Sequence, residues 1–400
     1  MSEETEFGNG ELLPAEGDTS RLEAFLPTDN VQNHAANLLP LPNGDLLCVW
    51  FSGTQEGMSD ISVYSARLMA GSERWSDLRK LSEDSTRSEQ NPVLFLAPSG
   101  ALWLFWTSQK AGNQDSAVVM RRISNDNGAT WGPIEVFIDT PGTFVRQPII
   151  VLDNGDWLLP VFYCVPVPGK KWVGDKDYSA VKISSDQGKT WTEVAVPGST
   201  GCVHMNIEKL DDGSLVAVFR SRWADHVYLT RSHDNGRSWD VPIPSGLPNN
   251  NSSVQMTRLT NGHLAIVFNN VRAKESTERR LSLYDEIEDG ADEGASDGSE
   301  ETSPTAGGSA GEGRTAFWGT PRAPLSIAIS EDGGRTWSRI RDLEVGDGFC
   351  LTNNSSDARN REYSYPSIKQ TPDGAIHIAY TYFRQRIKYV RIREDWVFKA

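Results

Sequence analysis

An octapeptide that occurs four times constrains the fold of this chain more than any other feature. Each copy reads Ser-x-Asp-x-Gly-x-Thr/Ser-Trp, with five fixed places. The copies span residues 124–131, 184–191, 232–239 and 330–337. Repeats of this kind, separated by strands, are typical of a β-propeller, in which each repeat belongs to one four-stranded blade.

Turn chemistry explains the fixed places of the octapeptide. The Asp side chain can accept hydrogen bonds from nearby backbone N–H groups, and Gly adopts the positive φ that a tight turn needs. The closing Trp is large enough to plug the gap between two neighbouring sheets. We therefore expect a structural connector and not a calcium loop, since most ligands of an EF-hand are missing.

A second repeat lies between the copies of the first. A turn glycine followed by a buried-strand pattern of apolar residues occurs six times, and the first five glycines are 49 to 58 residues apart. Six turns predict six blades, and a degenerate form of the repeat, Ser65–Trp75, belongs to the first blade. The glycines are Gly44, Gly100, Gly155, Gly213, Gly262 and Gly374.

The two ends of the chain suggest how the ring closes. The last blade has no octapeptide, so a strand near Leu22–Leu26 can complete its sheet. We expect one all-β domain, a six-bladed propeller over residues 22–398, preceded by a flexible N-terminus at residues 1–21.

An insertion at about residues 273–315 lengthens the fifth blade. Its centre, Asp285–Glu301, holds nine acidic residues among Gly, Ser and Ala. Such a segment buries too little apolar surface to offset its ordering entropy, so we expect a disordered loop. The less polar flanks, residues 279–287 and 314–324, are expected to fold back near the mouth of the propeller.

Composition excludes several classes of partner. The net charge is −15, of which nine charges lie in the acidic insertion, and no basic patch is present that could neutralise phosphates. This argues against nucleic acid and membrane surfaces. The four cysteines have no metal-ligand spacing, so neither a metal nor a cofactor is expected. The N-terminus has no apolar segment, which favours the cytosol; the oligomeric state stays open.

Repeated Asp boxes on a six-bladed propeller resemble the sialidase (neuraminidase) superfamily, and in particular its bacterial-neuraminidase-repeat members. The resemblance covers about residues 30–395. It implies an exo-acting glycoside hydrolase on a sialic-acid-like or other acidic sugar. Because the boxes lie away from the active site in that superfamily, the activity has to be argued from the residues at the mouth.

The mouth is expected where the first strand of each blade begins and the second strand ends. Polar residues occupy these places in all six blades. Their convergence predicts a ligand site rather than a merely wet surface. Counted from the turn glycines, the candidate substrate-binding residues are His34, Asn91, Arg146, Gln147, His204, Arg220, Arg222, Asn269 and Tyr363.

The resemblance also implies catalytic residues. Sialidases use a tyrosine nucleophile activated by a glutamate, because the substrate carboxylate would repel an anionic carboxylate nucleophile. Tyr365 resembles that tyrosine, with Glu362 as the candidate base and Tyr363 as the alternative nucleophile. The acid/base aspartate of the superfamily corresponds to the loop after the second strand, where Asp60 is preferred over Glu56.

Three arginines hold the substrate carboxylate in sialidases, because guanidinium pairs well with a planar carboxylate. This chain departs from the pattern, since His34 stands where the first arginine is expected. The remaining arginine candidates are Arg146, Arg220, Arg222, Arg322 and Arg384.

Three functions remain open at this stage. The first is the retaining glycoside hydrolase with a tyrosine nucleophile. The second is a polysaccharide lyase on uronic acids, in which His34 or His204 acts together with Tyr365 and an arginine. The third is a carbohydrate-binding propeller without turnover. An ultraviolet-absorbing unsaturated product would separate the lyase from the hydrolase.

Overall fold

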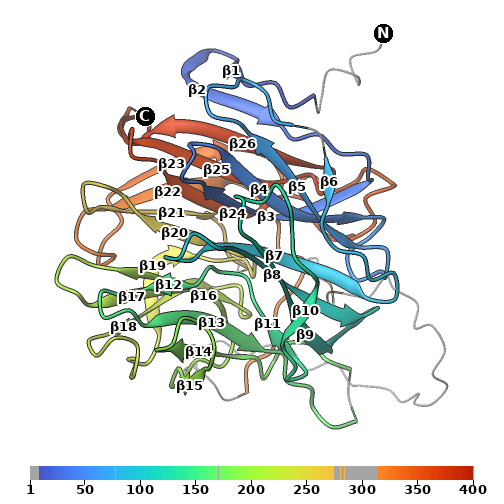
Figure 1. The fold of residues 1–400 in the computed structure, drawn as a ribbon, viewed down its shortest axis with the longest axis vertical. Coiled ribbons are helices and arrows are strands. Elements are labelled where there is room, and N and C mark those ends of the chain that lie inside the picture. The colour runs from blue at the N-terminus through green and yellow to red at the C-terminus, as the bar shows by residue number, and fades with distance from the viewer. Residues whose placement is uncertain are drawn as a thin grey trace.

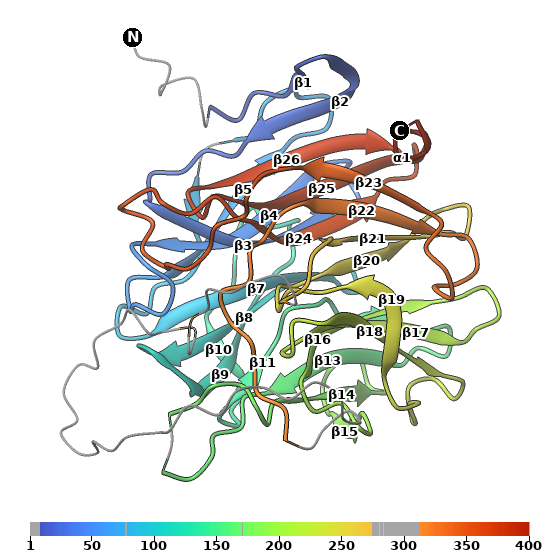
Figure 2. The ribbon, with the colours of Figure 1, turned by 180° about the vertical axis from the view of Figure 1, so that it is seen from behind.

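The chain forms six antiparallel sheets in sequence order around one axis, as seen in a computed structural model (Figures 1 and 2). The first strands of neighbouring blades lie side by side, β24 (Tyr363–Gln370) next to β3 (Gln32–Pro40) and β3 next to β7 (Ser88–Leu96). The six-bladed propeller expected from the repeats is confirmed. The structure describes residues 9–399 except 77, 170, 274–279, 281–282 and 284–312.

The first three blades order their strands along the chain from the axis outward, and in the third blade two short strands together form the innermost strand. The acidic stretch Asp285–Glu301 of the fifth blade, expected to be a disordered loop, lies outside the described residues. Blades one to three consist of β3 (Gln32–Pro40), β4 (Leu46–Gly53), β5 (Ser62–Leu68) and β6 (Arg79–Lys80); β7 (Ser88–Leu96), β8 (Leu102–Lys110), β9 (Asn113–Ser124) and β10 (Glu135–Ile138); and β11 (Thr143–Phe144), β12 (Ile150–Val151), β13 (Trp157–Tyr163), β14 (Tyr178–Ser184) and β15 (Thr192–Ala195).

The remaining blades follow the same order, and apolar side chains fill the seams between neighbouring sheets. Blades four to six consist of β16 (Cys202–Lys209), β17 (Leu215–Ser221), β18 (His226–Ser232) and β19 (Ile243–Pro248); β20 (Gln255–Arg258), β21 (Leu264–Asn269), β22 (Leu325–Ser330) and β23 (Arg339–Glu344); and β24 (Tyr363–Gln370), β25 (Ala375–Tyr382) and β26 (Arg386–Arg393) with two N-terminal strands.

The N-terminal strands close the ring. Strand β2 (Asp18–Phe25) pairs antiparallel with β26, so that Leu22 lies opposite Arg391, and β1 (Leu13–Ala15) adds the outermost strand. Figure 1 shows these blue strands beside the red C-terminal ones. The closing strand is therefore confirmed, but the boundary expected at residue 22 is wrong, because the sheet begins at β1.

The C-terminal end of the chain is a short helix, α1 (Glu394–Phe398), which follows β26. Its Trp396 is buried against the last two blades. Within the described part of the chain, no helix reaches the length and apolar character of a membrane span. All four cysteines are buried and free.

Each Asp box is a self-contained hydrogen-bonded turn. In the first box Ser124 Oγ accepts the N–H of Gly128 at 2.8 Å and donates to Asp126 Oδ1 at 2.7 Å, while Asp126 accepts the backbone and side chain of Thr130. These bonds, led by the Thr130 hydroxyl, lower the pKa of Asp126 to about 2. The other three boxes repeat the pattern.

Four first strands carry one shared irregularity near the mouth. The pairing register with the second strand shifts within β3, β7, β16 and β24. One residue in each shift has a positive φ, namely Ala35, Asn91, His204 and Tyr365, at 63°, 50°, 58° and 51°. Such backbone is costly for residues other than glycine, and bulges re-aim side chains next to functional sites.

Candidate active site

Tyr365 lies at the centre of the mouth. Its side chain is buried, and its hydroxyl accepts a hydrogen bond from Arg220 Nη1 at 2.5 Å. The ring of His34 lies 4.2 Å from the Tyr365 ring and that of His204 lies 5.7 Å from it, measured between centroids. Residues from blades one, four and six therefore meet at one phenol.

Three guanidinium groups surround the same ring. Those of Arg146, Arg220 and Arg322 lie 5.4–5.6 Å from its centroid, within the range of a cation–π contact. Arg146 also donates from Nη2 to the carbonyls of Ala36, Tyr365 and Pro366 at 3.0–3.2 Å. Arg146 thus fixes the irregular backbone beneath the tyrosine.

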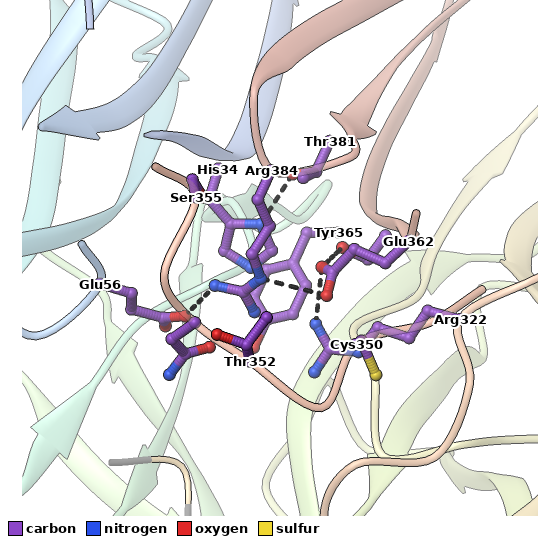
Figure 3. Close-up of polar contacts among 12 residues, drawn as sticks. His34, Glu56, Arg322, Cys350, Thr352, Ser355, Glu362, Tyr365, Thr381 and Arg384 are labelled. Carbon is purple, nitrogen blue, oxygen red and sulfur yellow. Dashed lines mark hydrogen bonds and ion pairs between the residues drawn. The ribbon is translucent and has the colours of Figure 1, made fainter. Parts of the chain in front are cut away.

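Glu362 joins two arginines (Figure 3). Its Oε1 lies 3.0 Å from Arg322 Nη1 and its Oε2 lies 3.1 Å from Arg384 Nε, and Ser364 Oγ donates to it at 2.6 Å. Burial alone would raise the pKa of Glu362, but the two guanidinium groups outweigh burial and lower it to about 2. The carboxylate is therefore charged and directed at the arginines. Among the described residues, no hydrogen bond joins it to Tyr365.

Two further carboxylates pair with arginines. Arg384 Nη1 contacts Glu56 Oε2 at 2.5 Å (Figure 3). Arg222 donates from Nε and Nη2 to Asp177 Oδ2 at 3.0 and 2.7 Å, and Asp177 also accepts the indole N–H of Trp172. Arg222 is therefore neutralised inside the protein.

Positive charge exceeds negative charge in this cluster. No carboxylate of the described residues pairs with Arg146 or Arg220, whose partners are neutral, with Arg220 Nε donating to Asn251 at 2.7 Å. Burial lowers the pKa of Arg146 to about 10 and that of Arg220 to about 9, so both are charged at neutral pH. Unpaired buried charge is costly, and an anionic ligand would remove that cost.

A small pocket lies in front of Tyr365. Its volume is about 10 Å³, which is room for about one water molecule. Most of its lining side chains are polar or charged, and Phe144, Phe162 and Leu283 are apolar. The lining residues are Glu56, Asn91, Gln114, Phe144, Phe162, His204, Arg220, Arg222, Leu283 and Tyr365.

Both histidines beside Tyr365 are neutral. Burial, and then the nearby arginines, hold the pKa of His34 and of His204 well below 6.5. His34 Nδ1 lies 2.8 Å from Thr381 Oγ1, while His204 Nδ1 is buried with no partner among the described residues. Because His204 lines the pocket, that nitrogen can serve a ligand or take up a proton.

The two acid candidates of the first loop are placed differently. Glu56 is 3% exposed and lines the pocket. Asp60 is exposed and accepts hydrogen bonds from the backbone and hydroxyl of Thr54, so its carboxylate ties the loop together. The preference for Asp60 over Glu56 is therefore reversed by the geometry.

Three other candidates lie away from the pocket lining. The Tyr363 hydroxyl donates to the carbonyl of Val345 at 3.3 Å within the core between the last two blades, which removes Tyr363 as an alternative nucleophile. Asn269 donates to the Tyr363 carbonyl at 2.8 Å, and Gln147 to that of Val254 at 2.8 Å. Asn269 thus ties the second strand of blade five to the first strand of blade six, and Gln147 ties blade three to the residue before β20.

Several site residues were not anticipated from the sequence. Asn251, which orients Arg220, belongs to the polar run Asn249–Ser253 just before β20, and this run was a usable signal. Phe144 and Phe162 lie on strands and resemble ordinary core residues. Leu283 belongs to the less polar flank of the insertion, and its place in the pocket agrees with the expectation that this flank folds back near the mouth.

Comparisons with known proteins agree with the fold. The family model of the BNR repeat-like domain matches residues 44–378. A comparison with curated protein sequences finds no match.

Solved structures resemble the chain across nearly all its length. The Hadza microbial sialidase Hz136 is 13% identical, with a TM-score of 0.65 over 92% of this chain and 67% of that one. A protein of unknown function from Dyadobacter fermentans is 14% identical, with a TM-score of 0.64 over 92% and 97%. The intramolecular trans-sialidase from Ruminococcus gnavus is 13% identical, with a TM-score of 0.61 over 91% and 95%. At these identities the likeness concerns the fold.

Proposed function

The chain belongs to the family of BNR repeat-like domains, which are sialidase-like propellers, and from that premise we propose a function. The proposed function is that of an exo-acting, retaining glycoside hydrolase that acts on an acidic sugar and uses Tyr365 as the nucleophile. The cytosol, as the compartment expected from the sequence, stays a prediction.

One observation carries the proposal. The Tyr365 hydroxyl is held by Arg220 in a small buried pocket, and among the described residues neither Arg220 nor Arg146, which lies against the Tyr365 ring, has a carboxylate partner. A sugar that brings its own carboxylate or other anionic group would balance this charge. The same anion would disfavour a carboxylate nucleophile, whereas a phenol is neutral until it reacts.

The residues divide the reaction into two steps. In the first, Tyr365 Oη attacks the anomeric carbon, and its proton passes to His204, whose protonated form becomes less costly once the substrate anion offsets the charge of the neighbouring arginines. Glu56 donates a proton to the departing oxygen. In the second, water attacks the glycosyl–tyrosine bond and gives a proton to Glu56, and the proton on His204 returns to the tyrosine oxygen. Two displacements retain the configuration of the anomeric carbon.

Binding has to widen the pocket, because about 10 Å³ does not hold a sugar ring. Glu56 lies on the turn between β4 and β5, whereas most other lining residues lie on strands. We expect the incoming sugar, with its anionic group on Arg220, to displace Glu56 from Arg384, which keeps Glu362 as its partner. Glu56, freed from its guanidinium partner, can then carry the proton that a general acid needs.

A polysaccharide lyase on uronic acids is the second candidate function. It is favoured by the neutral state of His34 and His204 and by the pairing of Glu362 with arginines. In that reaction His204 would take the proton beside the carboxylate and Arg220 would neutralise the carboxylate. The leaving oxygen would depart with a proton from Tyr365, and a double bond would form in the sugar.

Turnover of glycoside panels tests both functions. The panel contains fluorogenic 2-keto sugar acids, uronides and neutral sugars, with ultraviolet absorbance followed on uronate polymers. Release of the fluorophore from an acidic glycoside by the wild type, but not by Tyr365→Phe, supports the hydrolase. A fluorinated sugar inhibitor should then form a covalent bond to Tyr365, which mass spectrometry of the digested protein detects as a heavier Tyr365 peptide. An absorbance rise without hydrolysis supports the lyase. Binding of acidic sugars without either reaction leaves the carbohydrate-binding propeller.

A further inference from the structure

Two neighbouring arginines at the mouth have partners of different charge. Arg220 lies near the end of β17 and Arg222 follows it by two positions, and both line the small pocket. The Nε atom of Arg222 donates to Asp177 Oδ2 at 3.0 Å. The Nε atom of Arg220 donates to Asn251 Oδ1 at 2.7 Å. The same kind of contact is thus made once to a carboxylate and once to a neutral amide.

The surroundings of Asn251 fit an amide and not a carboxylate. Asn251 is 1% exposed, and its Nδ2 donates to the carbonyl of Phe317 at 2.9 Å. The backbone N–H of Phe317 donates to the carbonyl of Arg222 at 2.7 Å, which holds the Phe317 backbone in place. An aspartate would turn one of its oxygens toward the Phe317 carbonyl. The amide is therefore the side chain that satisfies both of its neighbours, since it carries one acceptor and one donor group.

The backbone at Asn251 is also fixed. Its φ of 58° is a conformation that asparagine adopts more readily than most residues do. Its N–H donates to Asn249 Oδ1 at 3.0 Å, and the same oxygen accepts the N–H of Ser221 at 3.0 Å. Because Ser221 is the last residue of β17, these bonds hold Asn251 in register with the strand that carries Arg220.

A neutral partner leaves the charge of Arg220 available to a ligand. Arg220 is 2% exposed, and its Nη1 donates to the Tyr365 hydroxyl. Within the described part of the chain, its Nη2 makes no hydrogen bond. A buried charged donor of this kind is costly until a ligand supplies an acceptor. A carboxylate in place of the Asn251 amide would neutralise Arg220 and weaken its attraction for an anion.

We propose that Asn251 makes the site selective for anionic sugars. Asn251 does not line the pocket, so it acts through Arg220 as a positioning residue. It orients the guanidinium group without neutralising it, and Arg220 Nη2 then donates to the anionic group of the sugar. This inference rests on the proposed function in so far as the ligand is an acidic sugar bound in front of Tyr365.

Acids compared with their amides test the selectivity by binding alone. The probes are glucuronate and N-acetylneuraminate, each paired with its neutral primary amide and titrated into the full-length protein by calorimetry. We expect the wild type to bind at least one acid about tenfold more tightly than its amide, since only the acid forms a charge-assisted hydrogen bond. Asn251→Asp should bring these two affinities within about twofold of each other, because Arg220 is then neutralised.

Asn251→Ala is the matched control. It removes the same hydrogen bonds to Arg220 and Phe317 but adds no charge. We expect the acid to stay preferred by about tenfold in this variant. The kcat on an acidic glycoside should fall by about tenfold, because Arg220 then holds the Tyr365 hydroxyl less firmly. Asn251→Ser, which keeps a hydroxyl acceptor, should recover part of that kcat.

Three results overturn the proposal. The first is an unchanged preference for the acid in folded Asn251→Asp. The second is a preference that disappears equally in Asn251→Ala, since orientation alone would then explain it. The third is a wild type that binds acids and amides equally, or binds neither. If Asn251→Asp does not fold, loss of the preference in Asn251→Ala overturns the proposal, whereas its retention there together with its loss in Arg220→Gln supports it.

The hydrolase and the role of Asn251 can fail separately. Selectivity that follows the charge at position 251, without turnover of any glycoside, supports the role of Asn251 and contradicts the hydrolase. Turnover of an acidic glycoside with unchanged selectivity in Asn251→Asp supports the hydrolase and contradicts the role of Asn251.

Discussion

The base of the propeller, which carries the Asp boxes, and its mouth, which carries Tyr365, differ in where their polar side chains find partners. At the base, four Asp boxes repeat one set of local hydrogen bonds, and each bond joins residues within eight positions of one another. At the mouth, Tyr365 meets Arg146, Arg220 and His34 from three other blades. Positive φ occurs in both places, at Asn127, Gln187 and Asn235 in the boxes and at Tyr365 in the mouth, but only the mouth combines it with arginines that have no carboxylate partner among the described residues. Buried charges without a partner therefore lie where a bound ligand is expected to supply that partner.

Removal of one hydroxyl at the mouth should give the largest effect on activity. We expect Tyr365→Phe to reduce turnover at least about a thousandfold, because the nucleophile is lost while the packing volume stays. The Tm should change by less than about 2 °C, since little packing is altered. Retained turnover in steady-state assays would exclude Tyr365 as the nucleophile.

Glu362→Gln should affect stability and its dependence on pH. The pKa of Glu362 is about 2 in the fold and ordinarily 4.5, so its contribution is present above pH 4.5 and disappears as the pH falls toward 2. We expect the variant to be destabilised by about 3 kcal/mol at neutral pH and to lose this acid dependence. Urea unfolding between pH 3 and pH 7 measures both; equal slopes for the two proteins would contradict the pairing.

Glu56→Gln and Asp60→Asn should separate the two carboxylates of one loop. Glu56→Gln is expected to lower kcat by about a hundredfold, because the pocket loses its proton donor. Asp60→Asn should leave kcat within about threefold of wild type, since its side chain faces Thr54. Leaving groups that need no protonation should restore Glu56→Gln; a stronger loss in Asp60→Asn would return the acid role to Asp60.

Ser124→Ala should affect only the base. The buried N–H of Gly128 loses its acceptor, and we expect a loss of about 1–2 kcal/mol in unfolding free energy with kcat unchanged. Thermal melts together with turnover measure this, and Ser232→Ala in another box should behave alike. A fall in kcat without a fall in Tm would show that base and mouth are coupled.

Much of the mouth was predictable because the turn glycines fix where each strand begins. Counting from Gly213 placed His204 and Arg220 near the mouth, and counting from Gly374 did the same for Tyr365. The count failed for Tyr363, because the register shift after Ser364 re-aims Tyr365 while Tyr363 stays in the core. It also favoured Asp60, because a spacing does not reveal which carboxylate of a loop turns inward.

The sequence by itself determined the number of blades, the boxes and the closing N-terminal strand, since these depend on short periodic patterns and local turns. Tertiary structure alone decided which charges meet. Asp177 neutralises Arg222, Glu362 joins Arg322 to Arg384, and Arg220 is left facing Tyr365. These partners lie up to 145 positions apart along the chain. Distance in space, not along the sequence, sets the strength of a charge interaction, so the surplus positive charge emerges only when the ring closes.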